Sequence, residues 1–209
     1  MKVFVGIDMS LRSPGVALIR PGDTAIYLMG FQQRKSDKEI INHKVVGPTE
    51  TVVITRCSYP VDVKDRWFRS EFVVNRIIEW IKGYIEPTDD VHVYIENYAL
   101  GMVGSSSVST LCELGGILRI SLYRLKWTFS EMSPGTVKKY FAGNGRASKL
   151  DMVAAYHVKY PRFTDVMKVR DGQHPQEDMI DALGIVLAGM YAKVIPKRKK
   201  KSRKRKPKK

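Results

Sequence analysis

The sequence begins with a short apolar segment that ends on an acidic residue. Between Lys2 and Asp8, four of the five residues are apolar and the fifth is glycine, which is typical of a strand buried on both faces of a sheet. A Pro14-Gly15 pair and a second apolar segment follow, so the pattern predicts a hairpin with Asp8 at or beside a central position. Because an ionised carboxylate there is costly without a partner, we expect a cation or a lysine close to Asp8.

The composition predicts a globular chain with one full core. The 209 residues are 44% hydrophobic and 10% aromatic, and this length fits one domain more easily than two. No apolar run approaches the roughly 18 residues that cross a bilayer, and the first residues lack the pattern of a secretory signal. Cys57 and Cys112 form neither a disulfide framework nor a metal-binding spacing. We therefore expect no membrane partner and a reducing, intracellular location.

The positive charge is concentrated at the end of the sequence. Of the formal net charge of +15, the 11 Lys and Arg residues from Lys197 to Lys209 supply +11, which leaves +4 for the rest. So dense a run of like charges predicts a disordered tail over 196–209, after a folded domain over 1–195. Counterion release makes DNA or RNA its natural partner. The alternatives are a solubility tail or, in a eukaryotic cell, a nuclear import signal.

The order of the expected elements indicates an α/β fold. Strands are expected at 2–8, 15–20, 24–31, 91–96 and 127–130, with a short extra strand at 51–55. Helices are expected at about 65–85, 107–125, 134–141, 148–159 and 175–191. The first three strands form an antiparallel meander, and helical crossovers make the later strands parallel. We expect a five-stranded mixed sheet with helices on both faces.

Four carboxylates from three elements are candidates for one site. Asp8 and Glu96 end predicted strands, at the edge where α/β sheets place their sites. Asp178 and Asp181 share one face of the last helix. Held together, these groups would repel one another unless cations neutralised them. Oxygen ligands without a His or Cys set favour magnesium or manganese over zinc, and two such ions about 4 Å apart can catalyse phosphodiester hydrolysis.

Each of these signals also has a simpler interpretation. Turns favour aspartate, so Asp8 and Glu96 could mark strand ends alone. Asp178 and Asp181 could lie on a solvated helix face, where acidic residues favour the first turn. The combination is more specific than any one of its parts.

The order of motifs resembles that of the RuvC group of Holliday junction resolvases, within the RNase H-like fold. The matching segments span most of residues 2–190, and in chain order they are Gly6-Ile-Asp8, Pro14-Gly15, Ile95-Glu96, Thr136-Val-Lys138, Gly143-Asn-Gly145, Lys149 and Asp178-Met-Ile-Asp181-Ala-Leu183. The resemblance implies a homodimeric, magnesium-dependent endonuclease that cuts four-way DNA junctions. Its metal ligands would be Asp8, Glu96, Asp178 and Asp181.

The resemblance also implies roles for basic residues. Lys138 and Lys149 match lysines that contact phosphate or assist the catalytic water, and we expect a catalytic role for Lys149. Lys139 and Arg146 lie beside them in the sequence and join them as candidate DNA-binding residues. The helix around Leu111–Leu122 matches the dimer helix of the family.

The sequence departs from the family in three places. The family's base-stacking aromatic position holds Ala99 here, and the neighbouring aromatic is Tyr98, one residue early. This leaves Tyr98 as a DNA-binding candidate whose stacking role is open. The insertion at 32–60 and the basic tail lie outside the bacterial pattern, which suggests a phage or viral version. Its location would be the bacterial or host cytoplasm, or the nucleus of a eukaryotic host.

Two other functions fit the same residues. An RNase H-like nuclease could act instead on RNA–DNA hybrids, flaps or forks, with the same fold and metals. A branched-DNA-binding protein with a degenerate catalytic site is the other alternative, and the presence of all four acids argues against it.

Overall fold

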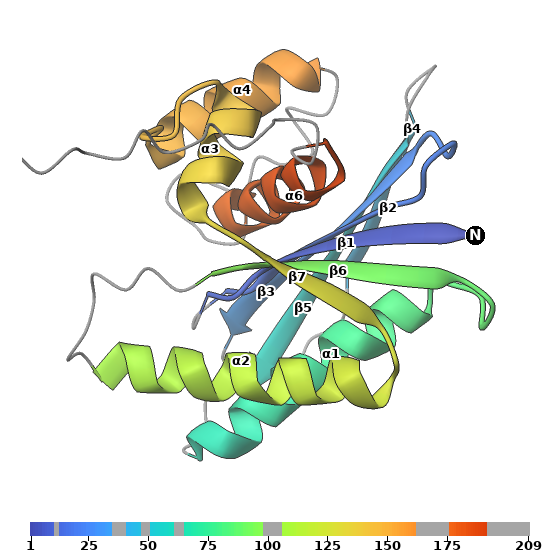
Figure 1. Cartoon of the computed structure of the whole chain (residues 1–209), viewed down its shortest axis with the longest axis vertical. Coiled ribbons are helices and arrows are strands. Elements are labelled where there is room, and N and C mark those ends of the chain that lie inside the picture. The colour runs from blue at the N-terminus through green and yellow to red at the C-terminus, as the bar shows by residue number, and fades with distance from the viewer. Residues whose placement is uncertain are drawn as a thin grey trace, which may run out of the picture.

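The structure, a computed structural model, describes residues 1–10, 13–34, 41–46, 51–60, 65–97, 106–161 and 176–191. These residues form one mixed sheet flanked by helices (Figure 1). Its seven strands are β1 (Lys2–Asp8), β2 (Gly15–Ile19), β3 (Ala25–Arg34), β4 (Ile41–Val46), β5 (Thr51–Pro60), β6 (Asp90–Glu96) and β7 (Thr128–Met132). They are ordered β4-β5-β3-β2-β1-β6-β7 across the sheet. The basic tail and Tyr98 lie outside the described residues.

The expected five strands are confirmed, and the short extra strand expected at 51–55 is part of β5 (Thr51–Pro60); among the described strands, only β4 was not expected. Strands β1, β2 and β3 form the antiparallel meander, and β6 and β7 continue parallel to β1. The insertion supplies β5, which runs parallel to β3, and β4, which pairs antiparallel to β5. The mixed sequence of β4, in which three polar residues interrupt the apolar ones, concealed it, because an edge strand has only one neighbour and does not need to be apolar on both faces.

The helices divide between the two faces of the sheet, as expected (Figure 1). Helices α1 (Arg66–Lys82) and α2 (Ser106–Arg124) cover one face. Helices α3 (Pro134–Ala142), α4 (Lys149–Lys159) and α6 (Gln176–Tyr191) cover the other. Each face therefore has its own apolar cluster, and the central strands are buried between them.

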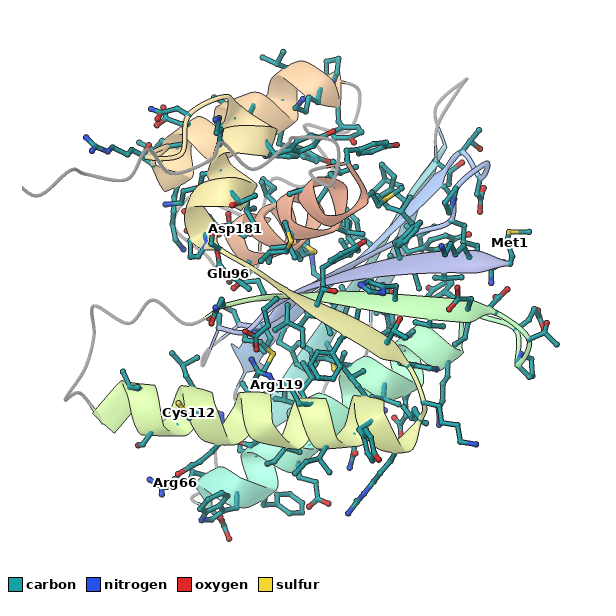
Figure 2. The ribbon with its side chains drawn as sticks, in the orientation of Figure 1. Met1, Arg66, Glu96, Cys112, Arg119 and Asp181 are labelled. Atoms are coloured by element: carbon teal, nitrogen blue, oxygen red, sulfur yellow. The ribbon has the colours of Figure 1, made fainter. Side chains whose placement is uncertain are left out.

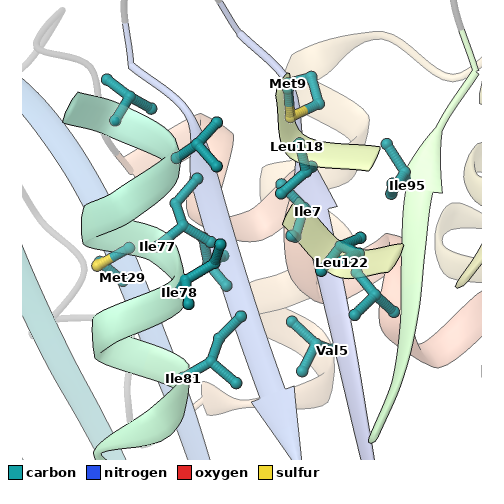
Figure 3. Close-up of a cluster of buried hydrophobic side chains, with 14 of the residues drawn as sticks. Val5, Ile7, Met9, Met29, Ile77, Ile78, Ile81, Ile95, Leu118 and Leu122 are labelled. Atoms are coloured by element: carbon teal, nitrogen blue, oxygen red, sulfur yellow. The ribbon is translucent and has the colours of Figure 1, made fainter. Parts of the chain in front are cut away.

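The first cluster joins α1 and α2 to the central strands. Val5 and Ile7 of β1 lie against Ile77 of α1 and Leu118 of α2 (Figure 3), and all four side chains are fully buried. Leu114 and Leu122 are buried in the same cluster. The outward side of α2 instead carries the exposed side chains Ile120 and Tyr123. The leucine stripe of α2 thus stabilises the core of the monomer.

Local capping explains where the two short helices on the second face begin. The Ser133 hydroxyl accepts a hydrogen bond from the Thr136 N–H, and Pro134 occupies the first turn of α3. Helix α4 begins with a capping box, in which Ser148 and Asp151 each accept from the other's backbone N–H. Because both starts are fixed, the lysines near them have defined positions.

Glycine allows α6 to lie directly on the sheet. A Cβ atom at Gly6 would overlap the Ala182 carbonyl, and one at Gly15 would overlap the Asp178 carbonyl. The first half of α6 therefore rests on the bare backbone of β1 and β2. No helix among the described residues is long and apolar enough to span a membrane.

Candidate functional site

Two acidic side chains lie next to each other at one end of the sheet. Strands β1 and β6 are adjacent and parallel, and Ile7 is paired with Ile95. Asp8 and Glu96 are the next residues of the two strands and the last of each. Because parallel strands end at the same edge, both carboxylates are presented there. The predicted meeting of Asp8 with Glu96 thus follows from sheet register alone.

Helix α6 adds two further acids from above the sheet. The Asp178 backbone sits over Gly15, which is paired in register with Asp8. Asp181 lies one turn further along α6, beside Glu96 in Figure 2. Asp178 is almost fully buried, with 3% of its surface exposed, whereas Asp181 keeps partial contact with solvent. The close packing of α6 on glycine therefore determines where these carboxylates lie.

The charges at this edge act on one another. Burial raises the pKa of Asp8 well above its usual range, and neighbouring negative charges raise it further. Those charges come from Asp178, Asp181 and Glu96, while Lys149 acts in the opposite direction. All four predicted acids therefore belong to one electrostatic cluster.

The pKa values of Glu96 and Asp181, two other members of the acidic cluster, are also raised. Burial, with the charge of Asp181, raises the pKa of Glu96 to about 7. Burial also raises the pKa of Asp181 to about 6, where Asp178 adds to the effect. Lys138 and Lys149 act against both increases. Burial is the larger cause in both cases, and the lysines only partly offset the combined effect of burial and negative charge.

The described residues hold no preassembled metal cage. No group of three or more His, Cys, Asp or Glu side chains among them is arranged to hold a metal ion as it stands. The chemistry of the cluster nevertheless fits a hard divalent cation, because its donors are carboxylate oxygens and their mutual repulsion would be relieved by positive charge.

Lys149 is the cation most closely tied to the acids. It is the first residue of α4, and its Nζ forms an ion pair with Glu177 Oε2 at 3.0 Å. Burial alone would lower the pKa of Lys149, but the hydrogen bond with Glu177 and the charges of Asp178 and Asp181 raise it overall. More than half of its side-chain surface, 55%, is exposed. Lys149 is therefore beside the acids and partly exposed to solvent.

The other predicted DNA-binding residues differ in their relation to the site. Lys138 of α3 is close enough to influence Glu96 and Asp181. Lys139 and Arg146 are exposed, on α3 and in the turn before α4, and are not among the groups that shift the pKa values of the acids. They lie on the same side of the sheet as the acids, where a long polyanion could reach them.

The comparisons with known proteins agree with this geometry. Neither the protein-family models nor the curated proteins include a match to the sequence. Among solved structures, RuvC of Thermus thermophilus superposes with a TM-score of 0.55 over 91% of this chain and 95% of that chain, at 14% identity. The chain has the RuvC fold.

Two further structures support the same assignment of fold. T. thermophilus RuvC in complex with a Holliday junction substrate matches with a TM-score of 0.55 at 14% identity, covering 91% of this chain and 94% of that chain. The yeast mitochondrial Holliday junction resolvase Ydc2 matches with a TM-score of 0.51 at 12% identity, covering 90% and 77%. All three structures therefore support an RNase H-like fold for this chain.

Two polar residues of the site were not predicted from the sequence. Glu177 forms the ion pair with Lys149, and the Ser13 hydroxyl donates a hydrogen bond to Asp178 Oδ2. Glutamate is common in the first turn of a helix, and serine is common in a hairpin turn, so neither residue type indicates a functional site. Both partners are more than 25 residues away in the chain, so no local pattern could reveal them.

Proposed function

We propose that the protein is a divalent-metal-dependent endonuclease that cuts branched DNA, four-way junctions above all. The proposal rests on one observation: the pKa values of Asp8, Glu96 and Asp181 are all raised where the ends of β1 and β6 meet helix α6 in a RuvC fold. Perturbed carboxylates that gather at one edge of an α/β sheet mark functional sites. Of the matching structures, one RuvC complex contains a Holliday junction substrate, and Ydc2 is named a Holliday junction resolvase.

Magnesium or manganese would be held by Asp8, Glu96, Asp178 and Asp181, with two ions in the site. When bound, such ions activate the attacking water and stabilise the departing 3′ oxygen of the phosphodiester. The fit rests on an all-carboxylate donor set in which the pKa values of Asp8 and Glu96 are raised, so both groups bind protons more readily than ordinary carboxyl groups. A cation would displace those protons, so metal binding should be weaker at low pH.

The lysines would bind and orient the scissile phosphate. Lys149 carries three N–H donors on an exposed side chain beside the acids, and Lys138 extends the same positive charge toward Glu96. Lys139, Arg146 and the tail of 196–209 would contact neighbouring backbone phosphates, which fix the position of DNA without reading its sequence. Tyr98 stays a candidate for stacking on an opened base.

A homodimer would let the enzyme cut two strands of one junction. Because Leu114, Leu118 and Leu122 are buried within the monomer, the partner would meet the outward side of α2. Ile120 and Tyr123 are exposed there, by 54% and 80%. Sedimentation equilibrium of the wild type and of Tyr123→Asp tests this arrangement, and a monomeric wild type would overturn it.

A cleavage panel tests the proposed activity. Synthetic four-way junctions, forks, flaps, RNA–DNA hybrids and plain duplexes are incubated with magnesium or with EDTA. We expect magnesium-dependent cutting of the junction, and Asp8→Asn should bind the junction without cutting it. Equal cutting of the junction by the wild type and by Asp8→Asn would refute the proposed nuclease site. Preference for hybrid would favour the ribonuclease alternative, and binding without cutting under any divalent metal would favour the degenerate protein.

A further inference from the structure

The turn between β1 and β2 contacts the first turn of α6 through a buried polar pair. The Ser13 hydroxyl donates to Asp178 Oδ2, although 165 residues separate them. Each residue has only 3% of its surface exposed. A buried carboxylate needs such donors, but the contact also constrains which way the carboxylate of Asp178 faces.

The two residues that follow Ser13 are fixed to their surroundings. Two residues later, Gly15 lies directly beneath the Asp178 backbone. Between them, the Pro14 carbonyl accepts a hydrogen bond from the Phe31 N–H at 3.2 Å, which ties the turn to β3. Backbone packing therefore sets the position of α6, and the Ser13 hydroxyl bonds the side chain of Asp178 in its first turn.

We infer that Ser13 is a positioning residue for Asp178, holding its carboxylate in the orientation in which it meets a divalent cation. The inference rests on the proposed function, since it assigns Asp178 to the metal site. Residues that hydrogen-bond a metal ligand fix its orientation, and their loss commonly weakens metal binding by about 10- to 100-fold. Ser13 contacts neither the metal nor DNA in this assignment and works through Asp178 alone.

A purely structural role would give a different result, and Ser70 provides the control. Ser70 is 5% exposed, and its hydroxyl donates to the Arg66 carbonyl within α1, on the opposite face of the sheet from the acids. Ser70→Ala removes a buried hydroxyl of equal size far from the cluster. Both variants should lose some stability, whereas only Ser13→Ala should change metal binding.

The experiment measures manganese binding to the full chain without DNA. Free Mn²⁺ is followed by electron paramagnetic resonance for the wild type, Ser13→Ala and Ser70→Ala, with thermal unfolding in EDTA as the check on folding. We expect about 10- to 100-fold weaker binding for Ser13→Ala and wild-type binding for Ser70→Ala. In cleavage assays, Ser13→Ala should need more magnesium for half-maximal rate and recover at saturation.

The outcomes separate this inference from the proposed function. Wild-type manganese affinity in Ser13→Ala would overturn the role of Ser13 and leave the nuclease intact. A wild type that binds no manganese would overturn both. If Ser13→Ala does not fold, Ser13→Cys replaces it, because a thiol is similar in size and a weaker donor. Weaker binding by Ser13→Cys supports the inference, and unchanged binding refutes it.

Discussion

Replacing Asp181 with asparagine should stabilise the metal-free protein at neutral pH. The pKa of Asp181 rises from 3.8 to about 6 in the fold, so between these values the folded state binds more protons than the unfolded state. Stability then falls as pH increases through this window. The loss is complete above about pH 6, and it is absent below pH 3.8. Asparagine keeps the shape of the side chain and carries no charge, so the variant avoids this loss.

The pKa increase sets the size of the effect. A rise of about 2 pH units corresponds to about 3 kcal/mol as an upper limit. Because Asp181 keeps partial contact with solvent, screening reduces the expected gain to about 2 kcal/mol. For a chain of this length, that gain corresponds to an increase of roughly 4–8 °C in unfolding temperature.

Thermal unfolding in EDTA, from pH 4 to pH 8, measures this difference. The increase in unfolding temperature of Asp181→Asn over the wild type should be near zero at about pH 4 and reach its full value above about pH 6. The exposed Asp90 at the start of β6 is the matched control, because Asp90→Asn leaves the acidic cluster intact. Magnesium should reduce the advantage of Asp181→Asn by relieving the repulsion in the wild type. A variant that is less stable than the wild type at pH 8 would refute the electrostatic reasoning.

Three other predictions concern packing, phosphate contacts and the tail. Gly15→Ala should cost about 3 kcal/mol or more in unfolding free energy, because its Cβ would overlap the backbone of α6; Gly116→Ala, with open space around its Cβ, should gain up to about 1 kcal/mol in the same denaturant titration. Lys149→Ala should lower the single-turnover cleavage rate at least about tenfold, whereas Lys139→Ala should only weaken DNA binding slightly. Similar cleavage rates for the two variants would contradict the assigned roles. Deletion of 196–209 should weaken DNA binding and flatten its salt dependence without moving the cut sites; full-strength binding by the truncated chain would indicate that the tail serves transport.

Strong periodicity and strand-end acids made much of the fold predictable. The apolar runs before Asp8 and Glu96 predicted two strands that end on acids, and the structure places these strands adjacent and parallel, with both acids at one edge. The stripe of Leu114, Leu118 and Leu122 gave α2, and it packs in the core. Each of these patterns lies within one segment, so it can be recognised in the sequence without knowledge of distant contacts.

The missing parts depend on contacts between distant segments. Strand β4 has little sequence signal, because pairing with β5 alone holds it in the sheet. The hydrogen bond between Ser13 and Asp178 joins residues 165 positions apart, and the ion pair between Lys149 and Glu177 joins two helices. The order of motifs could therefore indicate the candidate ligands, but not the residues that contact them.

The contact of α6 with Gly6 and Gly15 has a consequence for genetics. These positions contribute no functional group, yet any side chain there would lift the helix that carries two of the acids. A screen for inactive variants should therefore recover substitutions at both glycines as readily as substitutions at the carboxylates. Expression level would distinguish the two classes, since the glycine variants fail by misfolding and the carboxylate variants accumulate as intact, inert protein.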